Sequence, residues 1–310
     1  MSLHRLSSVT IGVPDVAAAA SYYDEFGLSQ VAPGRFTSAD GGEQLRLEHA
    51  PVRRLLGVEI GVDDSDDLGR AAQRLTSFGV VVERSAESVS AVEPVTGVRV
   101  TLRVMAHLVQ TPTPATPYNG PGRADRPNGR APGILREDSV RPRKLGHIVI
   151  GSTDEDTSRR FFTEGLGFKT SDHVPGVAAF LRCSTDHHNI LVQAAPVSFL
   201  HHTAWEVDDV DEVGRGATAM LQGHPERHVW GLGRHHIGSN FFWYLRDPAG
   251  NFSEYYSDLD EIVDEQLWKP EAMQAARGLY NWGPPPPPSF IRPEDLAALM
   301  TGAHSLRQSR

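Results

Sequence analysis

Two histidines and one glutamate in the second half of the chain combine residue types and spacing that suit a metal site. His147 and His202 stand at corresponding places in two similar segments, each seven residues before an aspartate, and Glu254 lies on a later strand-like run, NFSEYYS. Two imidazoles and one carboxylate on one side of an ion leave the opposite positions open. Such an ion can bind both a substrate and dioxygen, so these residues predict a centre for ferrous iron.

The other residue types narrow the choice of ligands. Cys183 is the one cysteine, so an intramolecular disulfide and a cysteine-rich zinc site are excluded, and we expect it to be a small core residue. Most of the 14 histidines lie between His147 and His236. We therefore expect a metal bound by histidines and carboxylates in the second half. These donors suit Fe(II), and Mn(II) is the alternative, because ligand type alone does not separate the two ions.

Four segments of the chain share one pattern, in which an apolar strand continues through an acidic turn into an amphipathic helix. They are SSVTIGVPDVAAAASYY, LLGVEIGVDDSDDLGRAAQRL, KLGHIVIGSTDEDTSRRFF and HHTAWEVDDVDEVGRGATAML. Short strand-like runs separated by turn residues follow each helix. In the third segment we expect Thr153 or Asp154 to cap the helix.

A single unit of one strand, one helix and about three further strands leaves a sheet edge and a sheet face unburied, so such units are expected to pair. The predicted fold is therefore α+β, with four βαβββ modules paired into two domains. Each domain is expected to be a cupped mixed sheet with helices outside, and its concave side forms a site. In the second domain the repeat places His147 and His202 in the same cavity.

A segment rich in proline and glycine separates the two halves. Residues 112–142 have no sustained apolar periodicity and are typical of an inter-domain linker. Beyond the last strand lies a tail with five consecutive prolines and a helix expected to begin near Pro293, and we expect this tail to cover the site entrance. The predicted division is a non-catalytic module pair at 1–108, a linker at 109–143, a catalytic metal-binding pair at 144–258 and the tail at 259–310.

The first half has the same pattern without the ligands. Ser8 and Gly57 stand where His147 and His202 stand in the second half, and the corresponding later strand offers no inward-facing carboxylate. A lone histidine at a strand start more often has a structural role. A shared ion is favoured here because His147 and His202 occupy corresponding places in two repeated segments. Because side chains alternate along a strand, we expect three neighbouring histidines to point to the opposite face and assign them no ligand role. They are His187, His201 and His236.

The composition indicates an ordinary globular protein. With 39% apolar and 22% charged residues the chain can bury a core, and its formal net charge of -9 argues against a nucleic-acid partner. No apolar stretch approaches the ~20 residues that cross a bilayer, and the start of the chain has no signal-type apolar block. We therefore expect a cytoplasmic protein that contacts neither nucleic acid nor membrane. Exposed sheet edges favour a homo-oligomer.

Four motifs in the second half are similar to those of a known family: GHIVIGS, FLRCSTDHH, HHTAWEV and GRHHIGSNFFWYLRDPAGNFSEYY. On these motifs the chain resembles the type I extradiol ring-cleaving catechol dioxygenases of the vicinal oxygen chelate superfamily, a group that includes 2,3-dihydroxybiphenyl and catechol 2,3-dioxygenases. The resemblance covers the architecture from about residue 1 to residue 258. It implies that His147, His202 and Glu254 bind the iron.

The resemblance also implies roles for side chains around the metal. His188 matches the histidine that acts as acid and base toward the reacting oxygen. His235 and Tyr244 match the pair that contacts the substrate hydroxyls. In this way the catechol would be held through both of its oxygens, oriented by His235 and Tyr244 and supplied with a proton by His188.

Three further positions are expected to line the substrate pocket. Phe180 matches part of its wall, and Val149 and Gly238 stand where some members of the family carry polar groups, so substrate preference is expected to depend on them. The implied reaction is extradiol cleavage of a catechol by dioxygen at a mononuclear Fe(II) centre. Its product would be a ring-opened semialdehyde or keto acid in the catabolism of aromatic compounds.

Two other functions fit the same fold. A non-redox metal isomerase or lyase of the glyoxalase-like type would need four protein ligands, and the sequence offers three. A non-catalytic module that binds an aromatic ligand would have no reason to keep His147, His202 and Glu254 together. The ligand set therefore favours the dioxygenase.

Overall fold

The computed structural model describes residues 3–270 and 279–308. The first half of the chain contains two successive units, each with one strand, one helix and three further strands. The first unit is β1 (Leu3–Val13), α1 (Val16–Glu25), β2 (Ser29–Ala32), β3 (Arg35–Ser38) and β4 (Gly42–His49). The second is β5 (Arg54–Val62), α2 (Ser65–Phe78), β6 (Val82–Arg84), β7 (Ser88–Val92) and β8 (Arg99–Val104).

The second half repeats this order of elements. Its first unit is β9 (Lys144–Ser152), α3 (Glu155–Arg160) with one π-helical turn η2 (Phe161–Leu166), β10 (Lys169–Val174), β11 (Ala178–Arg182) and β12 (Ile190–Ala194). Its second unit is β13 (Phe199–Glu206), α4 (Val210–Leu221), η3 (Pro225–Arg227), β14 (His228–Arg234), β15 (Phe241–Arg246) and β16 (Phe252–Ser257). Within the described ranges, no helix combines the length and apolar composition that a membrane crossing requires.

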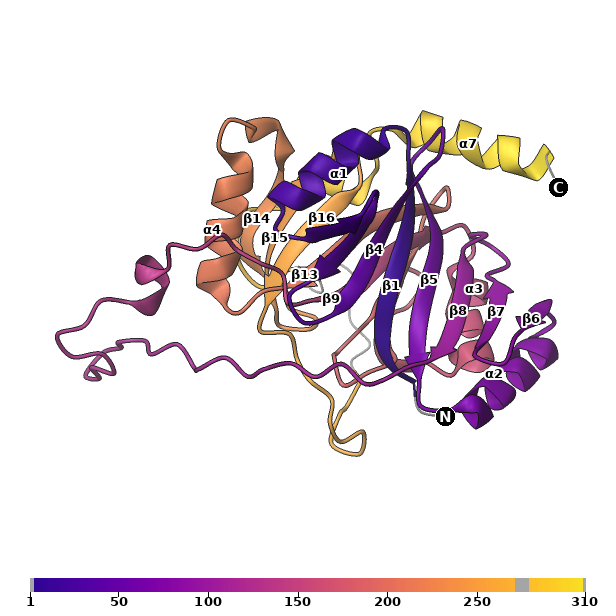
Figure 1. Cartoon of the computed structure of the whole chain (residues 1–310), viewed down its shortest axis with the longest axis horizontal. Helices are drawn as coiled ribbons and strands as arrows, with labels where there is room; N and C mark the ends of the chain where they lie inside the picture. The colour runs from indigo at the N-terminus through magenta and orange to yellow at the C-terminus, as the bar shows by residue number, and fades with distance from the viewer. Residues whose placement is uncertain (1–2, 271–278, 309–310) are drawn as a thin grey trace.

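The units pair into two eight-stranded sheets, as Figure 1 shows. The strand order is β2-β3-β4-β1-β5-β8-β7-β6 in the first sheet and β10-β11-β12-β9-β13-β16-β15-β14 in the second. In each sheet the first strands of the two units pair antiparallel with each other and parallel with the last strand of their own unit. The predicted α+β fold of four paired βαβββ modules with mixed sheets is confirmed.

Each unit turns from its first strand into its helix through an aspartate. Asp15, Asp64, Asp154 and Asp209 cap helices α1 to α4, and each carboxylate accepts a hydrogen bond from the backbone N–H three residues later. The contact satisfies an N–H that a helix start leaves without a partner. Of the two residues predicted to cap the third helix, Asp154 is the cap.

One hydrophobic core joins the two sheets. The rings of Phe26, at the end of α1, and Tyr255, in β16, are stacked with 3.9 Å between their centroids, and the Tyr255 hydroxyl donates to the Phe26 carbonyl at 2.7 Å. Elsewhere in the core, Phe78 of α2 meets Phe161 edge to face. Side chains of the first half thus pack directly on the second, and the division into the predicted domains stays a prediction.

Residues 105–143 connect the sheets and extend away from the body of the molecule (Figure 1). They contain one short 3-10 turn, η1 (Pro132–Leu135). The Gln110 amide donates to the carboxylate of Glu206 at 2.8 Å, and the Arg136 guanidinium bridges Asp209 at 2.6 Å and Glu212 at 2.8 Å. The connection is therefore fastened to the second half near the start of α4.

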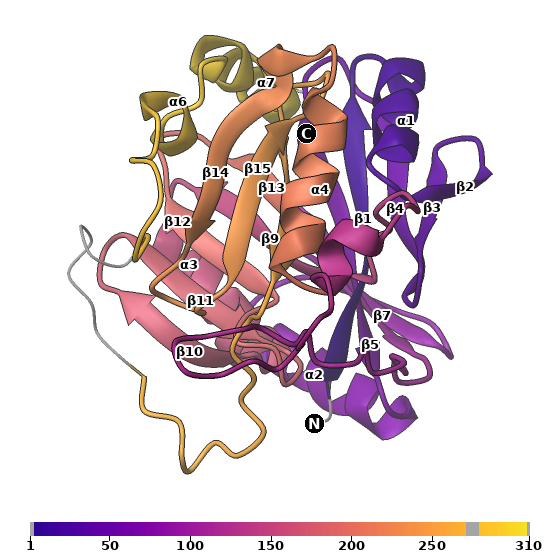
Figure 2. The same ribbon diagram turned by 90° about the vertical axis from the view of Figure 1, so that its left-hand side faces the viewer.

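The tail after β16 returns to the second sheet. It contains α6 (Pro288–Ile291) and α7 (Leu296–Gln308), and α6 packs on β14 (Figure 2). The helix predicted to begin near Pro293 begins at Leu296, where the Asp295 carbonyl accepts from the Leu299 N–H. Pro293 thus lies in the turn between two helices and is not the first residue of one.

Candidate metal centre

The three predicted ligands lie on three neighbouring strands at the centre of the second sheet. His147 is in β9, His202 in β13 and Glu254 in β16. Ala204, two residues after His202, is paired with His147 on one side and with Glu254 on the other. A methyl group between the two larger side chains leaves space above β13, so the register itself brings the imidazoles and the carboxylate together.

One carboxylate oxygen lies close to both imidazoles. Glu254 Oε2 is 3.2 Å from His147 Nε2 and 3.4 Å from His202 Nε2. The side chains are buried, with 2% of His147, 4% of His202 and none of Glu254 exposed. The two rings are nearly perpendicular, at 76° with 5.5 Å between centroids. Their nitrogens can therefore approach one point from different directions.

The arrangement fits a divalent metal ion. His202 Nε2 and Glu254 Oε2 are buried and make no hydrogen bond, and such atoms are costly to bury unless something binds them. Within the described residues, no fourth histidine, cysteine or carboxylate joins the cluster. Two imidazoles and one carboxylate are the donors expected for Fe(II) or Mn(II) with free coordination positions.

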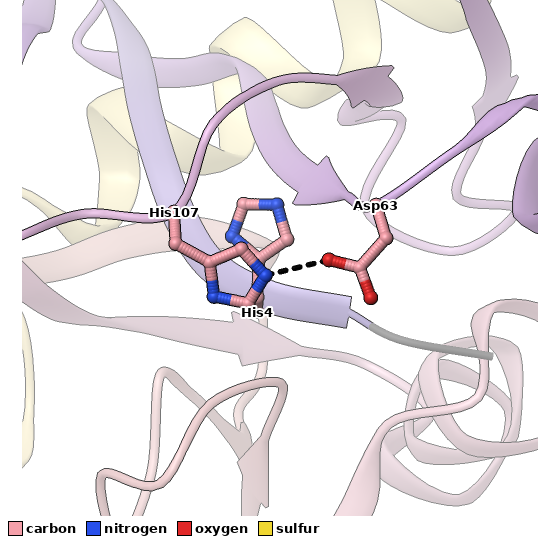
Figure 3. Close-up of side chains that lie close together, drawn as sticks. All are labelled: His4, Asp63 and His107. Carbon is pink, nitrogen blue, oxygen red and sulfur yellow. Dashed lines mark hydrogen bonds and ion pairs between the residues drawn. The ribbon is translucent and has the colours of Figure 1, made fainter.

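A second group of potential ligands lies in the first half and has a different geometry. His4, Asp63 and His107 come together at one end of the first sheet, and His107 Nε2 is 2.6 Å from Asp63 Oδ1 (Figure 3). The rings of His4 and His107 are stacked, with 4.1 Å between centroids and 16° between planes. An imidazole binds a metal in its ring plane, so two nearly parallel rings do not direct their lone pairs at a common ion. The His107 side chain is also 64% exposed, and we interpret the group as a surface hydrogen bond with a stacked ring.

The concave face of the first sheet lacks ligands at the matching positions. Ser8, Glu59 and Thr101 pair side by side there as His147, Ala204 and Glu254 pair in the second sheet. Gly57 precedes Glu59 as His202 precedes Ala204. The Glu59 carboxylate is already engaged by Arg46 and Arg103, at 3.4 and 3.6 Å. The first half thus keeps the register and not the metal-binding side chains, as the sequence predicted.

A hydrogen bond fixes the other oxygen of the buried glutamate. The Asn240 amide donates to Glu254 Oε1 at 3.1 Å, which leaves Oε2 facing the imidazoles. His235 Nε2 lies 3.9 Å from the same Oε1 and 2.8 Å from the Tyr244 hydroxyl. Burial, together with the charge of Glu254, raises the pKa of Tyr244 well above its usual value, so the hydroxyl stays protonated at neutral pH. The structure places the predicted pair together beside the glutamate.

His188 lies beside the first ligand. Its ring centroid is 4.2 Å from that of His147 and 5.2 Å from that of Phe180. Burial, followed by the nearby histidines, lowers its pKa well below the usual value, so the ring is neutral at pH 7. Its Nδ1 is 3.1 Å from Nδ1 of His187, whose Nε2 lies 2.9 Å from a carboxylate oxygen of Asp172.

His202 has a similar chain of contacts behind it. Its Nδ1 is 2.7 Å from Nδ1 of His201, and His201 Nε2 is 2.7 Å from the carbonyl oxygen of Phe290. Burial lowers the pKa of His201 to about 4, so this ring is neutral as well. His201 and Phe290 were not predicted as site residues. In the sequence, only the adjacent pair of histidines indicated His201, and no local pattern indicated Phe290.

The expected strand alternation of three neighbouring histidines is wrong. His187 lies in the loop after β11 and His236 in the loop after β14, and His236 is exposed. In β13, the pairing with β9 shifts register between Leu200 and His202, so His201 sits at an irregularity and contacts His202. Alternation holds in a regular strand and fails at a bulge or in a loop.

The three residues predicted to line the pocket lie near the triad. Val149, in β9, is paired with His202 and buried. Phe180 flanks His188, and a Cβ on Gly238 would lie 3.5 Å from Cε1 of the same ring. Gly238 has φ of +83°, a left-handed conformation that disfavours other residues. This backbone requirement explains the glycine, and contact of these residues with a substrate stays a prediction.

The tail completes the surroundings of the triad. The Phe290 ring packs on Tyr244 and His201, with 4.7 Å between centroids in each case. Arg53, which directly precedes β5, holds this part of the tail, because its guanidinium donates to both oxygens of Asp295 at 2.6 and 2.9 Å. The same side chain donates to the Leu200 carbonyl at 2.8 Å, next to the His201–His202 pair.

Comparison with known proteins identifies relatives of the chain. Residues 144–255 match the family described as the Glyoxalase/Bleomycin resistance protein/Dioxygenase superfamily. Metapyrocatechase 2 of Cupriavidus necator is 30% identical over 306 residues, which cover 94% of this chain and 92% of that protein. Biphenyl-2,3-diol 1,2-dioxygenase of Paraburkholderia xenovorans (strain LB400) is 27% identical, over 82% of this chain and 88% of that protein.

A solved structure has the same fold. The Mn(II)-bound glyoxalase from Novosphingobium aromaticivorans superposes with a TM-score of 0.74 at 26% identity, over 92% of this chain and 93% of that one. The relationship to metapyrocatechase spans both halves of the fold, not the metal-binding half alone. It confirms the resemblance seen in the sequence. The chain belongs to the extradiol ring-cleaving dioxygenases of the vicinal oxygen chelate superfamily, which are oxidoreductases.

Proposed function

We propose that the protein opens the ring of a catechol by extradiol cleavage at a single Fe(II) ion held by His147, His202 and Glu254. The observation that carries the proposal is the convergence of these three buried groups, whose ligand atoms lie within 4.8 Å of one another. An Fe(II) ion held by these three residues would bind catechol and dioxygen and pass electrons between them. The product is a ring-opened semialdehyde or keto acid in aromatic catabolism. The names of the two curated relatives support a catechol as substrate.

The protein's own groups then orient the substrate and move its protons. Tyr244 and His235 are hydrogen-bonded to each other beside Glu254, so together they can bind and orient a substrate hydroxyl. His188 uses Nδ1 for its contact with His187, which leaves Nε2 to take a proton from the substrate and then return it at the reacting oxygen. Its neutral state at pH 7 suits this exchange.

The pocket wall points to an aromatic substrate of modest size. Phe180 flanks His188, and Val149 lies next to His202. We propose that these side chains and the Gly238 backbone contact the catechol ring and its substituent. A monocyclic or bicyclic catechol fits this apolar lining.

The alternative functions find less support in the site. The structural similarity to a protein described as a glyoxalase makes a metal-dependent isomerase the first alternative. An isomerase site of that kind needs four protein ligands, and the cluster of described residues has three. A non-catalytic binding module gives no reason for two polar atoms, His202 Nε2 and Glu254 Oε2, buried without a hydrogen bond.

Oxygen uptake tests the proposal directly. The metal-free protein is loaded anaerobically with Fe(II) or Mn(II), mixed with a panel of alkyl, aryl and carboxylated catechols, and exposed to oxygen. We expect oxygen consumption together with a coloured ring-fission product, and Glu254→Gln should lose both by at least about 100-fold. His107→Gln, in the other histidine–carboxylate group, is the matched control and should retain them. Turnover that survives Glu254→Gln, or that depends on His107, would refute the proposed site. A cytoplasmic location and self-association stay predictions.

A further inference from the structure

His201 uses both of its ring nitrogens. Nε2 lies 2.7 Å from the carbonyl oxygen of Phe290, and Nδ1 lies 2.7 Å from Nδ1 of His202. A carbonyl oxygen can only accept a hydrogen bond, so Nε2 of His201 carries the proton. A neutral imidazole has one N–H, and Nδ1 of His201 is therefore an acceptor.

The acceptor at His201 determines where the proton of His202 resides. His202 must donate its Nδ1–H to His201, and its Nε2 is then an unprotonated lone pair. That Nε2 is the atom 3.4 Å from Glu254 Oε2. We infer that His201 is a positioning residue which, held by the Phe290 carbonyl, keeps His202 in the one tautomer whose Nε2 can bind the metal.

This inference rests on the proposed metal site and goes beyond it, because it makes the tail part of the metal's surroundings. The carbonyl comes from Phe290, which is far from the ligands in sequence. Phe290 is in turn placed by α6 and by the Arg53–Asp295 ion pair. A residue from the first half of the chain thus helps to set the proton position on a ligand in the second sheet.

The two histidine ligands differ in this respect. Among the described residues, no group makes a hydrogen bond to the buried Nδ1 of His147. No hydrogen-bond partner among the described residues therefore fixes the tautomer of His147, whereas His201 fixes the tautomer of His202. Outer partners of this kind usually contribute about 10- to 100-fold to metal affinity, so the loss of His201 should be measurable at His202.

His187 provides a matched control. It is also a buried histidine whose Nδ1 meets Nδ1 of the next residue, at 3.1 Å, and whose Nε2 has an acceptor, Asp172. Its neighbour His188 is not one of the three ligands. Replacing His187 therefore removes a comparable buried imidazole without touching a ligand's proton.

The first experiment measures binding of Mn(II) to the full-length, metal-free protein by equilibrium dialysis. His201→Phe keeps an aromatic ring and removes both hydrogen bonds, so we expect affinity to fall about 10- to 100-fold. His201→Asn places an acceptor near the former Nδ1 and should restore most of the affinity, while His187→Phe should bind as the wild type does. Equal affinity of His201→Phe and wild type, or an equal loss in His187→Phe, would overturn the inference.

The second experiment observes the tautomer without metal. Long-range proton–nitrogen correlation spectra of the nitrogen-labelled wild type should show His202 protonated at Nδ1 and His201 at Nε2. A proton on His202 Nε2 would overturn the inference even if the protein binds metal and cleaves catechols. By contrast, wild-type Mn(II) binding that is unchanged by Glu254→Gln would remove the proposed site itself, and the inference with it.

Discussion

The Nε2 atom of His201 and the main-chain oxygen of Phe290 are 2.7 Å apart, although the two residues belong to a central strand and to the tail. His201 lies directly beside the ligand His202, so this contact joins the tail to the metal site. The aromatic ring of Phe290 packs on Tyr244 as well. The tail is thus in contact with the neighbour of a candidate ligand and with a candidate substrate-binding residue.

Replacement of Arg53 by methionine should loosen the tail. The Arg53 guanidinium is buried and donates to Asp295, Asn251 and the Leu200 carbonyl. Removing it leaves these acceptors without a charged donor, and we expect the free energy of unfolding to fall by about 2–4 kcal/mol. Arg99→Met, which breaks the exposed pair with Glu83, should cost much less, because solvent screens ion pairs at the surface. Urea unfolding of both variants measures the difference, and equal losses would contradict the anchoring role.

The metal-free protein should lose stability as the pH falls below 6.5. Burial lowers the pKa of His201 from 6.5 to about 4 in the folded protein. Below pH 6.5 the unfolded chain therefore binds a proton that the folded protein does not. The contribution of this group is fully present above pH 6.5 and falls by roughly 1 kcal/mol at pH 5.5 and roughly 3 kcal/mol at pH 4.

Comparison with His201→Phe isolates that contribution from the other ionisable groups. The pKa values of His188 and His202 are also lowered by burial, so they act in the same direction and remain in the variant. Urea unfolding at pH 7.5 and 5.5 should show a smaller decrease for the variant than for the wild type. Identical decreases would mean that His201 does not resist protonation in the folded state.

Alanine at position 238 should impair turnover through His188. Gly238 has φ of +83°, and an added Cβ would meet Leu259 Cδ1 at 3.0 Å and His188 Cε1 at 3.5 Å. We expect a loss of about 1 kcal/mol from the backbone conformation and a lower kcat, because the strained backbone must relax while the new methyl group is in contact with the His188 imidazole.

Gly176→Ala is the control for the backbone term. Gly176 also has positive φ, +71°, but an added Cβ there would meet nothing within 4 Å. Thermal unfolding should show similar losses for the two variants, and steady-state kinetics should show a lower kcat only for Gly238→Ala. A parallel fall of kcat in both would attribute the effect to general destabilisation.

Valine at position 204 should prevent metal binding. Ala204 is fully buried and paired with both His147 and Glu254. Two added methyl groups would occupy the space between the ligands, with an overpacking cost of about 1–3 kcal/mol. Mn(II) affinity of Ala204→Val should fall by more than 10-fold, while Ala179→Val, also fully buried but in β11, should keep its affinity. Unchanged Mn(II) affinity of Ala204→Val would contradict the prediction, because the ligands would then tolerate a larger side chain between them.

The repeat in the sequence was sufficient for the architecture and for the positions of the three ligands. Four strand–aspartate–helix segments predicted four modules, because an N-cap and an apolar period are local properties of the chain. His147 and His202 could be paired because they occupy the same place in two modules, and Glu254 because it lies on the closing strand. These predictions depend on register, which the hydrophobic pattern specifies.

The sequence alone could not show what lies behind the ligands. Two pairs of adjacent histidines look alike in the sequence: His187 with His188, and His201 with His202. Simple strand alternation placed the first histidine of each pair on the opposite face of a strand, which is wrong. A loop and a register shift decide those positions, and both arise from how strands meet in the sheet. The contact of Phe290 with His201 depends on the path of a distant tail held by Arg53. Such long-range placement follows from tertiary packing, because no periodicity or spacing in the sequence encodes which distant carbonyl will face a given imidazole.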